Sequence, residues 1–174
     1  MMNNLELLHS SQEIEQAICQ IAATLNEIYK DKDPIIIGVL KGSICFVSDL
    51  IRKLSFPFTL EFIRAKSYGL RGDKPQEVTV EGVDFDISRK DVIVIDDIFD
   101  RGETLHKIID ELNKHHPSSI KSVLLLRKKS KKMTFLEPDY TLLDIEDKFV
   151  IGYGLDYKEH YRGLDGIYAF KSIP

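Results

Sequence analysis

The apolar positions along the chain follow two different periods, which predict helices and strands in alternation. Near the beginning, Ser10 and Glu13 form a capping box ahead of apolar residues at the three- and four-residue spacing of a helix. These apolar residues are Ile14, Ala17, Ile18, Ile21 and Leu25. Continuous, largely β-branched runs over residues 35–40 and 92–95 predict strands that are buried on both faces.

The same reading extends to the rest of the chain. A helix capped by Ser43 is predicted to run to about residue 54, and a second one to run from 104 to about 115. The polar stretch 66–76, which contains two glycines and a proline, predicts a long mobile loop. Further strands are predicted at 58–65, 78–83, 122–126, 140–144, 149–153 and 167–170.

Strands that alternate with helices predict an α/β fold, with a mainly parallel twisted sheet flanked by helices. The length of 174 residues fits a single domain. We expect a core over about 30–132 and a small cover, or hood, built from about 1–15 and 133–174. The first 30 residues carry no specific functional signal. In open α/β sheets, ligands bind beyond the carboxyl ends of the strands.

Composition narrows the possible partners. The net charge of -4 argues against broad attraction to nucleic acid, although residues 127–132 hold five cations. Such a run is most often a solvated loop. Two cysteines without metal or CxxC spacing indicate a reducing compartment. No apolar run approaches the roughly 18 residues of a membrane span, so a soluble cytoplasmic protein is expected.

An acidic motif follows the strand at residues 92–95. Asp96 and Asp97 end the apolar run, Asp100 follows three residues later, and Gly102 and Thr104 come before a helical pattern. Carboxylates can hold ribose hydroxyls or Mg²⁺, and the free N–H groups of a helix start can hold a phosphate. The motif therefore suits a sugar phosphate with a metal ion. The alternative is a strand tip with solvated acids and an Asp N-cap.

This stretch resembles the phosphoribosyl-pyrophosphate (PRPP) motif of type I phosphoribosyltransferases, in which two acids and two apolar residues precede Asp-Thr-Gly-x-Thr. Arg101 departs from it, because Thr or Ser is usual there. The resemblance implies that Asp96 and Asp97 bind ribose hydroxyls directly or through Mg²⁺. It makes Asp100 the general acid/base at purine N7, and a nearby second acid would favour proton exchange. The 5′-phosphate is implied to lie against Arg101, Gly102, Glu103 and Thr104.

Two further segments resemble the purine-salvage branch of that family. Lys41 and Gly42 follow a strand and imply a pyrophosphate-binding turn, although an ordinary strand-to-helix turn capped by Ser43 is the alternative. The order of residues 38–43 is not that of a P-loop. Ser67 and Tyr68 imply a flexible loop that closes over the site and excludes water. The alternative is a common loop sequence without that role.

The final part of the chain points to the base. Lys128 implies a donor to the purine O6, because an ammonium only donates hydrogen bonds and so disfavours a 6-amino group. The register within 127–129 is open, and a plain basic loop is the alternative. Residues 147–157 are nearly identical to a stretch of hypoxanthine-guanine phosphoribosyltransferases. That likeness implies stacking on the purine by Phe149 and base-edge contacts from the Val150 backbone; the alternative is a buried strand.

The same resemblance places Asp156 at Mg²⁺ and Arg162 at pyrophosphate. It implies transfer of the phosphoribosyl group from PRPP to N9 of hypoxanthine or guanine, which gives IMP or GMP and pyrophosphate in purine salvage. It also implies a homodimer or homotetramer. The alternatives are a xanthine- or adenine-preferring transferase and an RNA-binding regulator on the same fold. A phospho-acceptor receiver domain fits less well, because its acidic pair lies near the start of the chain.

Overall fold

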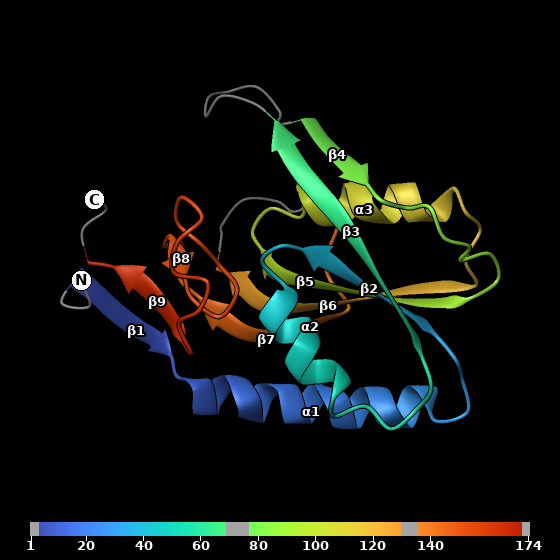
Figure 1. The fold of residues 1–174 in the computed structure, drawn as a ribbon, viewed down its shortest axis with the longest axis horizontal. Coiled ribbons are helices and arrows are strands. Elements are labelled where there is room, and N and C mark those ends of the chain that lie inside the picture. Colours follow the sequence, from blue (N-terminus) through green and yellow to red (C-terminus); the bar gives the residue numbers. More distant parts are fainter. Residues whose placement is uncertain (1–3, 69–76, 130–135, 172–174) are drawn as a thin grey trace.

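The computed structural model describes residues 4–68, 77–129 and 136–171, and a twisted six-stranded sheet forms its centre (Figure 1). Its strands, in spatial order, are β4 (Glu77–Glu81), β3 (Thr59–Tyr68), β2 (Ile35–Leu40), β5 (Asp91–Phe99), β6 (Ser119–Lys128) and β7 (Tyr140–Ile145). All neighbours in this sheet pair in parallel except β3 and β4. The predicted mainly parallel α/β sheet is therefore confirmed.

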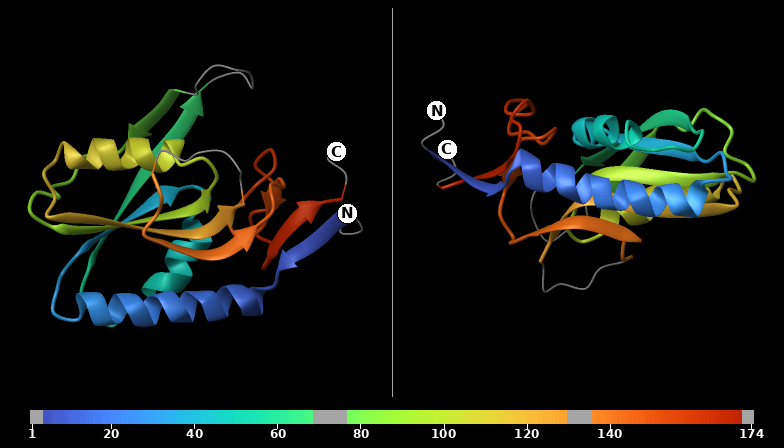
Figure 2. Two further views of the ribbon diagram at one scale, coloured as in Figure 1. Left: turned by 180° about the vertical axis from the view of Figure 1, so that it is seen from behind. Right: turned by 90° about the horizontal axis from the view of Figure 1, so that it is seen from below.

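Helices cover both faces of this sheet, as Figure 2 shows from two sides. On one face α1 (Ser11–Tyr29) and α2 (Ile44–Ile51) pack in one core cluster with Ile93 and Ile95 of β5. On the other face α3 (Glu103–Asn113) packs with Val92 and Val94. Successive side chains of a strand point to opposite faces, so the unbroken apolar run of β5 fills both cores.

The first helix begins as its sequence predicts. The Ser10 N–H donates to the Glu13 carboxylate at 2.8 Å, and the Glu13 N–H donates to Ser10 Oγ at 3.3 Å. This reciprocal pair is a complete capping box and satisfies two N–H groups that would otherwise have no partner. The helix then runs to Tyr29 and buries the predicted apolar face against the sheet.

The predicted ends of β3 and β5 are wrong, because pairing with neighbouring strands overrides the local pattern. β3 runs to Tyr68 rather than ending at 65, since it pairs antiparallel with β4, opposite Glu77. The backbones of Ser67 and Tyr68 therefore lie in a strand, not in the predicted loop, whose remaining residues 69–76 lie outside the described residues. β5 likewise continues to Phe99, because β6 pairs with it as far as Arg127.

The third error concerns Ser43. This residue does precede α2, but its hydroxyl makes no cap with the helix. Instead, Ser43 Oγ donates to the Val39 carbonyl at 2.6 Å within the buried interior. The hydroxyl thus ties the end of β2 to the turn that follows it.

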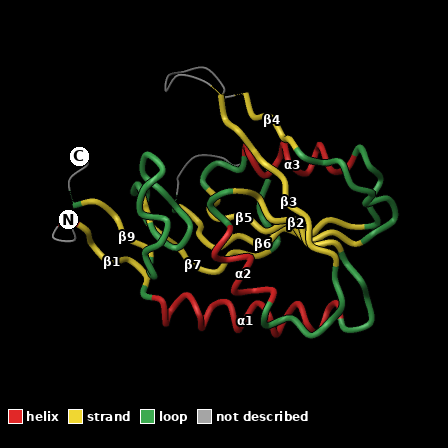
Figure 3. Tube along the Cα trace, in the orientation of Figure 1, coloured by secondary structure: helices red, strands yellow, loops and turns green. Residues whose placement is uncertain are grey.

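A second, three-stranded sheet lies at one end of the molecule, with both ends of the described chain in it (Figure 3). In it β9 (Ile167–Phe170) lies between β1 (Leu5–His9) and β8 (Val150–Ile151), all antiparallel. The sequence did not predict β1, whose short exposed segment depends on pairing with β9. β7 falls in the range expected for the cover, yet it is an edge strand of the central sheet. Among the described residues no helix has the length and apolarity to cross a membrane.

We predict that Ser10→Ala lowers the free energy of unfolding by about 1 kcal/mol, because the capping box is lost. Urea denaturation followed by circular dichroism would measure this change. The control is Ser11→Ala, one residue along α1 and outside the capping box. Its expected change is below about 0.5 kcal/mol. Equal losses in the two variants would contradict the role of the cap.

Candidate active site

A pocket of about 350 Å³ opens where β2 and β5 end at the same edge of the central sheet. The two strands are parallel neighbours in register, with Gly38 opposite Ile95, so the segments that follow them come together. A third segment completes the pocket; it belongs to the polar stretch after β8, residues 152–166. The residues singled out from the sequence that line it are Lys41, Gly42, Asp96, Asp97, Thr104, Asp156 and Arg162.

Asp96 and Asp97 form a close acidic pair on the floor of the site. Asp96 is buried, and its Oδ1 accepts a hydrogen bond of 2.8 Å from the Asp97 N–H. Burial raises the pKa of Asp96 well above its ordinary value, and the neighbouring Asp97 charge raises it further. Burial also raises the pKa of Asp97, although the Asp96 hydrogen bond and the Arg162 charge oppose that shift. The pair therefore favours a cation or a hydrogen-bond donor beside it.

Gly42 allows the three segments of the site to touch. A Cβ at this position would lie 1.5 Å from Asp97 Oδ2, so no larger residue fits while Asp97 stays in place. From the other side comes Gly154, at a φ of +100°, and a Cβ there would lie 2.1 Å from the Gly42 carbonyl oxygen. The Leu40–Lys41 peptide bond before this turn is cis. Two glycines thus set the distance between the acidic pair and the polar stretch after β8.

Four charged side chains meet above this turn. Arg162 Nη2 lies 2.8 Å from Asp156 Oδ1, while its Nη1 donates to the Gly154 carbonyl. Glu159 Oε2 lies 2.9 Å from Lys41 Nζ and 3.3 Å from Arg162 Nη2. The hydrogen bonds from Lys41 and then Arg162 lower the pKa of Glu159. Sequence reasoning missed Glu159; an acid three residues before Arg162, close to the matched stretch, was the available signal.

The start of α3, which lies next to the pocket, is a candidate site for an anion. Gly102 adopts a φ of +80°, and a Cβ on it would approach the Leu136 carbonyl oxygen to 2.9 Å. The helix begins at Glu103, and no side chain caps it. The first N–H groups of a helix have no partner within it and attract anions. Thr104 lines the pocket, whereas Arg101 is exposed.

A second group of residues lies outside that pocket, around the end of β6. Lys128 Nζ lies 3.3 Å from Asp147 Oδ1 and 3.9 Å from Asp100 Oδ2, and its side chain is only 16% exposed. The lysine beside Asp100 is therefore Lys128, because Lys129 instead pairs with Glu146 at 3.7 Å. The charged neighbour of Asp100 is thus a lysine, and the acidic pair that was expected there is formed by Asp96 and Asp97.

The residues after β7 add an aromatic surface. The Phe149 side chain is 38% exposed and meets the Tyr157 ring edge to face, with 5.7 Å between the ring centroids. Val150 is buried in β8, so only its backbone is available to a ligand. An exposed aromatic ring beside a backbone edge suits a planar heterocycle.

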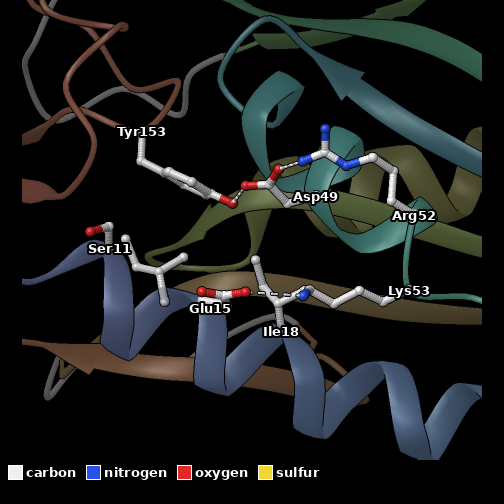
Figure 4. Close-up of a pocket in the computed structure, with 8 residues that line it drawn as sticks. Ser11, Glu15, Ile18, Asp49, Arg52, Lys53 and Tyr153 are labelled. Atoms are coloured by element: carbon white, nitrogen blue, oxygen red, sulfur yellow. Dashed lines mark hydrogen bonds and ion pairs between the residues drawn. The ribbon is translucent and has the colours of Figure 1, made fainter.

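Figure 4 shows how Tyr153, in the polar stretch after β8, contacts Asp49 of α2. The Tyr153 hydroxyl donates to Asp49 at 2.5 Å, and Asp49 also pairs with Arg52. Burial, followed by the bond to Asp49, raises the pKa of Tyr153, so the phenol stays protonated as a donor. The adjoining pocket of about 370 Å³ also contains the Lys53–Glu15 ion pair at 3.3 Å. We interpret this pocket as a packing seam between α1, α2 and the loop that carries Tyr153.

An acidic pair, an uncapped helix start and two clustered cations at one sheet edge suit a phosphorylated ligand, which α/β proteins bind beyond the carboxyl ends of their strands. The family model described as "Phosphoribosyl transferase domain" matches residues 4–158. The chain therefore belongs to the phosphoribosyltransferase family, and its mainly parallel sheet is the fold of the solved relatives.

Named relatives are similar over nearly the whole chain. The hypoxanthine-guanine phosphoribosyltransferase of Bacillus subtilis is 35% identical over 95% of this chain and 93% of its own length. The hypoxanthine phosphoribosyltransferase of Escherichia coli strain K12 is 34% identical over 94% of each. A crystal structure of a hypoxanthine phosphoribosyltransferase from Staphylococcus aureus superposes with a TM-score of 0.91 at 35% identity, covering 98% of this chain and 94% of that chain.

We predict that Gly42→Ala lowers kcat/KM for PRPP about 100-fold, because an added methyl group must displace Asp97 or the turn by more than an ångström. The control is Gly163→Ala, where an added Cβ would meet nothing within 4 Å. Steady-state kinetics and thermal unfolding of both variants would test this. Wild-type kinetics for Gly42→Ala would show that the turn is not part of the site.

We also predict that Asp96→Asn raises the Tm at neutral pH. A carboxyl whose folded-state pKa is raised stabilises the fold at low pH, and this contribution is lost as pH rises through the folded-state pKa. Asparagine carries no charge at any pH, so its advantage should shrink on acidification. Differential scanning calorimetry from pH 4 to 8 would measure this, with Asp31→Asn as the exposed control. A lower Tm at neutral pH would contradict the strain assigned to the acidic pair.

Proposed function

We propose that this chain transfers the 5-phosphoribosyl group of PRPP to N9 of hypoxanthine or guanine, with release of pyrophosphate, as a step of purine salvage. The choice of base rests on the position of Lys128 at the end of β6. Its ammonium lies 3.9 Å from the Asp100 carboxylate. When its proton is on N7, a 6-oxopurine offers an acceptor at O6 and a donor at N7, side by side on one edge. A lysine beside an acid matches that edge. The names of the relatives, hypoxanthine and hypoxanthine-guanine phosphoribosyltransferase, support the same choice.

The PRPP half of the reaction fits the pocket between β2, β5 and the polar stretch. Asp96 and Asp97 would accept hydrogen bonds from the ribose hydroxyls. The 5′-phosphate would lie against the α3 start, held by the N–H groups of residues 101–104 and by the Thr104 hydroxyl. Lys41, Gly42 and Arg162 would bind the pyrophosphate, two of them by charge and Gly42 through its backbone. Arg101 could add a positive charge for the 5′-phosphate, and Glu103 would point outward.

The base would lie between Phe149 and Lys128. Stacking of an aromatic ring on a base contributes about 1–3 kcal/mol at other nucleic-acid sites. The Val150 backbone would read the base edge, since its side chain is buried. Lys128 offers only hydrogen-bond donors, so it favours a 6-oxo group, which accepts hydrogen bonds, and disfavours the 6-amino group of adenine.

Magnesium is the proposed cofactor, and the donor set suits it. Asp96, Asp97 and Asp156 supply the hard oxygen ligands that Mg²⁺ prefers. Within the described residues no cluster of three or more acidic, histidine or cysteine side chains could hold a metal alone. This suits Mg²⁺, which is usually bound through one or two carboxylates together with substrate phosphates and water. When bound, the ion would neutralise charge on the departing pyrophosphate.

The chain's own residues would act mainly by positioning and by charge. As the bond from ribose C1 to pyrophosphate lengthens, positive charge develops on the ribose and negative charge on the leaving group. Lys41 and Arg162 would stabilise the latter. N9 of the base then attacks from the opposite face, while Asp100 accepts or returns the N7 proton.

Assembly and location are also proposed. A homodimer or homotetramer is the expected state, which light scattering after size exclusion would determine. The cytoplasm is the expected compartment, and the two free thiols, Cys19 and Cys45, suit it. A role in RNA binding gains no support, because Arg127, Lys128 and Lys129 each pair with an acid.

A panel of bases tests the function directly. With PRPP and Mg²⁺, hypoxanthine or guanine should give the nucleoside monophosphate, adenine should not, and EDTA should abolish the reaction. Absorbance and chromatography would follow the product. Product from xanthine alone would establish a xanthine-preferring enzyme. PRPP binding without product from any base would contradict the transferase assignment.

We predict that Asp100→Asn lowers kcat by about 10²- to 10⁴-fold while the Kd for PRPP changes little, because proton transfer is lost and sugar binding is kept. Single-turnover kinetics and calorimetric PRPP titration would separate the two quantities. Asp110→Asn, on the exposed face of α3, is the matched control. Parallel losses in turnover and PRPP affinity would exclude the acid/base role.

A further inference from the structure

Glu159 lies between Lys41 and Arg162, the two cations that would bind pyrophosphate under the proposed function. A single carboxylate oxygen, Oε2, is 2.9 Å from Lys41 Nζ and 3.3 Å from Arg162 Nη2. A phosphate oxygen would be bound by these two side chains in the same way. The chain thus supplies an anion of its own at the place where the substrate's anion would bind.

The backbone around Glu159 aims its side chain at this place. Residues 157–160 form a tight turn, in which Tyr157 and His160 exchange N–H to carbonyl bonds of 3.1 and 3.0 Å. Within it, Lys158 and Glu159 have φ angles of +51° and +65°, which are uncommon for residues other than glycine. The Glu159 N–H donates to Asp156 Oδ2 at 2.8 Å and fixes the turn to the same cluster.

The charges of this cluster cancel. Lys41 and Arg162 contribute two positive charges, and Asp156 and Glu159 contribute two negative ones, since Asp156 Oδ1 lies 2.8 Å from Arg162. A pyrophosphate that approaches the cations therefore meets a neutral group, and it has to replace Glu159 to pair with both. Replacement is easy in steric terms, because the Glu159 and Lys41 side chains are 66% and 59% exposed.

We propose that Glu159 is a displaceable internal anion of the pyrophosphate subsite. Before substrate binds, it holds Lys41 and Arg162 facing each other. When PRPP binds, its diphosphate displaces the carboxylate into solvent, and when pyrophosphate leaves, the carboxylate returns. The competition weakens the retention of pyrophosphate and so favours product release. This inference rests on the proposed function, because that function assigns the two cations to pyrophosphate.

Calorimetric titration of the full chain with magnesium pyrophosphate tests this inference without any turnover. Glu159→Gln keeps the size of the side chain and removes its charge, so pyrophosphate no longer competes with an anion. The Kd of this variant is expected to fall about 2- to 30-fold, the range for the loss of two surface ion pairs. Glu159→Asp keeps the charge and should remain closer to wild type. The exposed position of residue 159 leaves the Tm unchanged in both variants.

Glu27→Gln is the matched control, because it makes the same change in net charge on α1, where Glu27 pairs only with Lys30 in the described contacts. It should bind pyrophosphate as wild type does. An unchanged Kd for Glu159→Gln, or a weaker one, overturns the displacement idea while the pyrophosphate subsite stands. If the wild-type chain does not bind magnesium pyrophosphate at all, it is the subsite of the proposed function that fails.

Discussion

The whole site depends on a steric constraint at Gly42. This residue lies between the Asp97 carboxylate on one side and the Gly154 backbone on the other, and neither contact leaves room for a side chain. The turn after β2 can therefore approach the end of β5, and the polar stretch after β8 can close over both. Segments more than 100 residues apart in the chain meet because two glycines remove the atoms that would keep them apart.

Electrostatics divides the site into a strained part and a balanced part. Asp96 is buried and Asp97 is half-buried, and burial raises the pKa of both carboxyls, while the Asp97 charge raises that of Asp96 further. The charged cluster above them is balanced, since each cation has a carboxylate partner. A ligand that brings hydroxyl donors or a cation to the acids, and anionic oxygens to Lys41 and Arg162, would satisfy both parts at once. PRPP with a metal ion is such a ligand.

Much of the fold could be predicted, because its signals are local. The capping box at Ser10 and the apolar runs of β2 and β5 follow from neighbouring residues and need no knowledge of distant ones. Strand ends could not be predicted in the same way, since β3 extends to Tyr68 and β5 to Phe99 through pairing with other strands. β1 was missed for the same reason, because its partner β9 lies at the other end of the chain.

The site shows the same division. The motif around residues 96–104 and the stretch 147–157 could be interpreted from their order alone. In contrast, the sequence did not show which cation of residues 127–129 lies beside Asp100, and the environment of Asp100 was expected to be acidic but contains a lysine. Glu159 was missed, because its position depends on a turn with left-handed residues and on a lysine 118 residues away.

The polar stretch after β8 is largely bonded to itself. Gly152 and Leu155 exchange hydrogen bonds, the Tyr153 N–H donates to the Leu164 carbonyl, and the Gly154 N–H donates to the Arg162 carbonyl. Asp156, Glu159 and Arg162 therefore all belong to this one self-bonded stretch, whereas Asp100 and Lys128 lie at the ends of strands of the central sheet. Sequence drift can act on the two groups separately. Under the proposed function, a substitution at Lys128 would act on the acceptor base and leave the residues of this stretch that face pyrophosphate and the metal as they are.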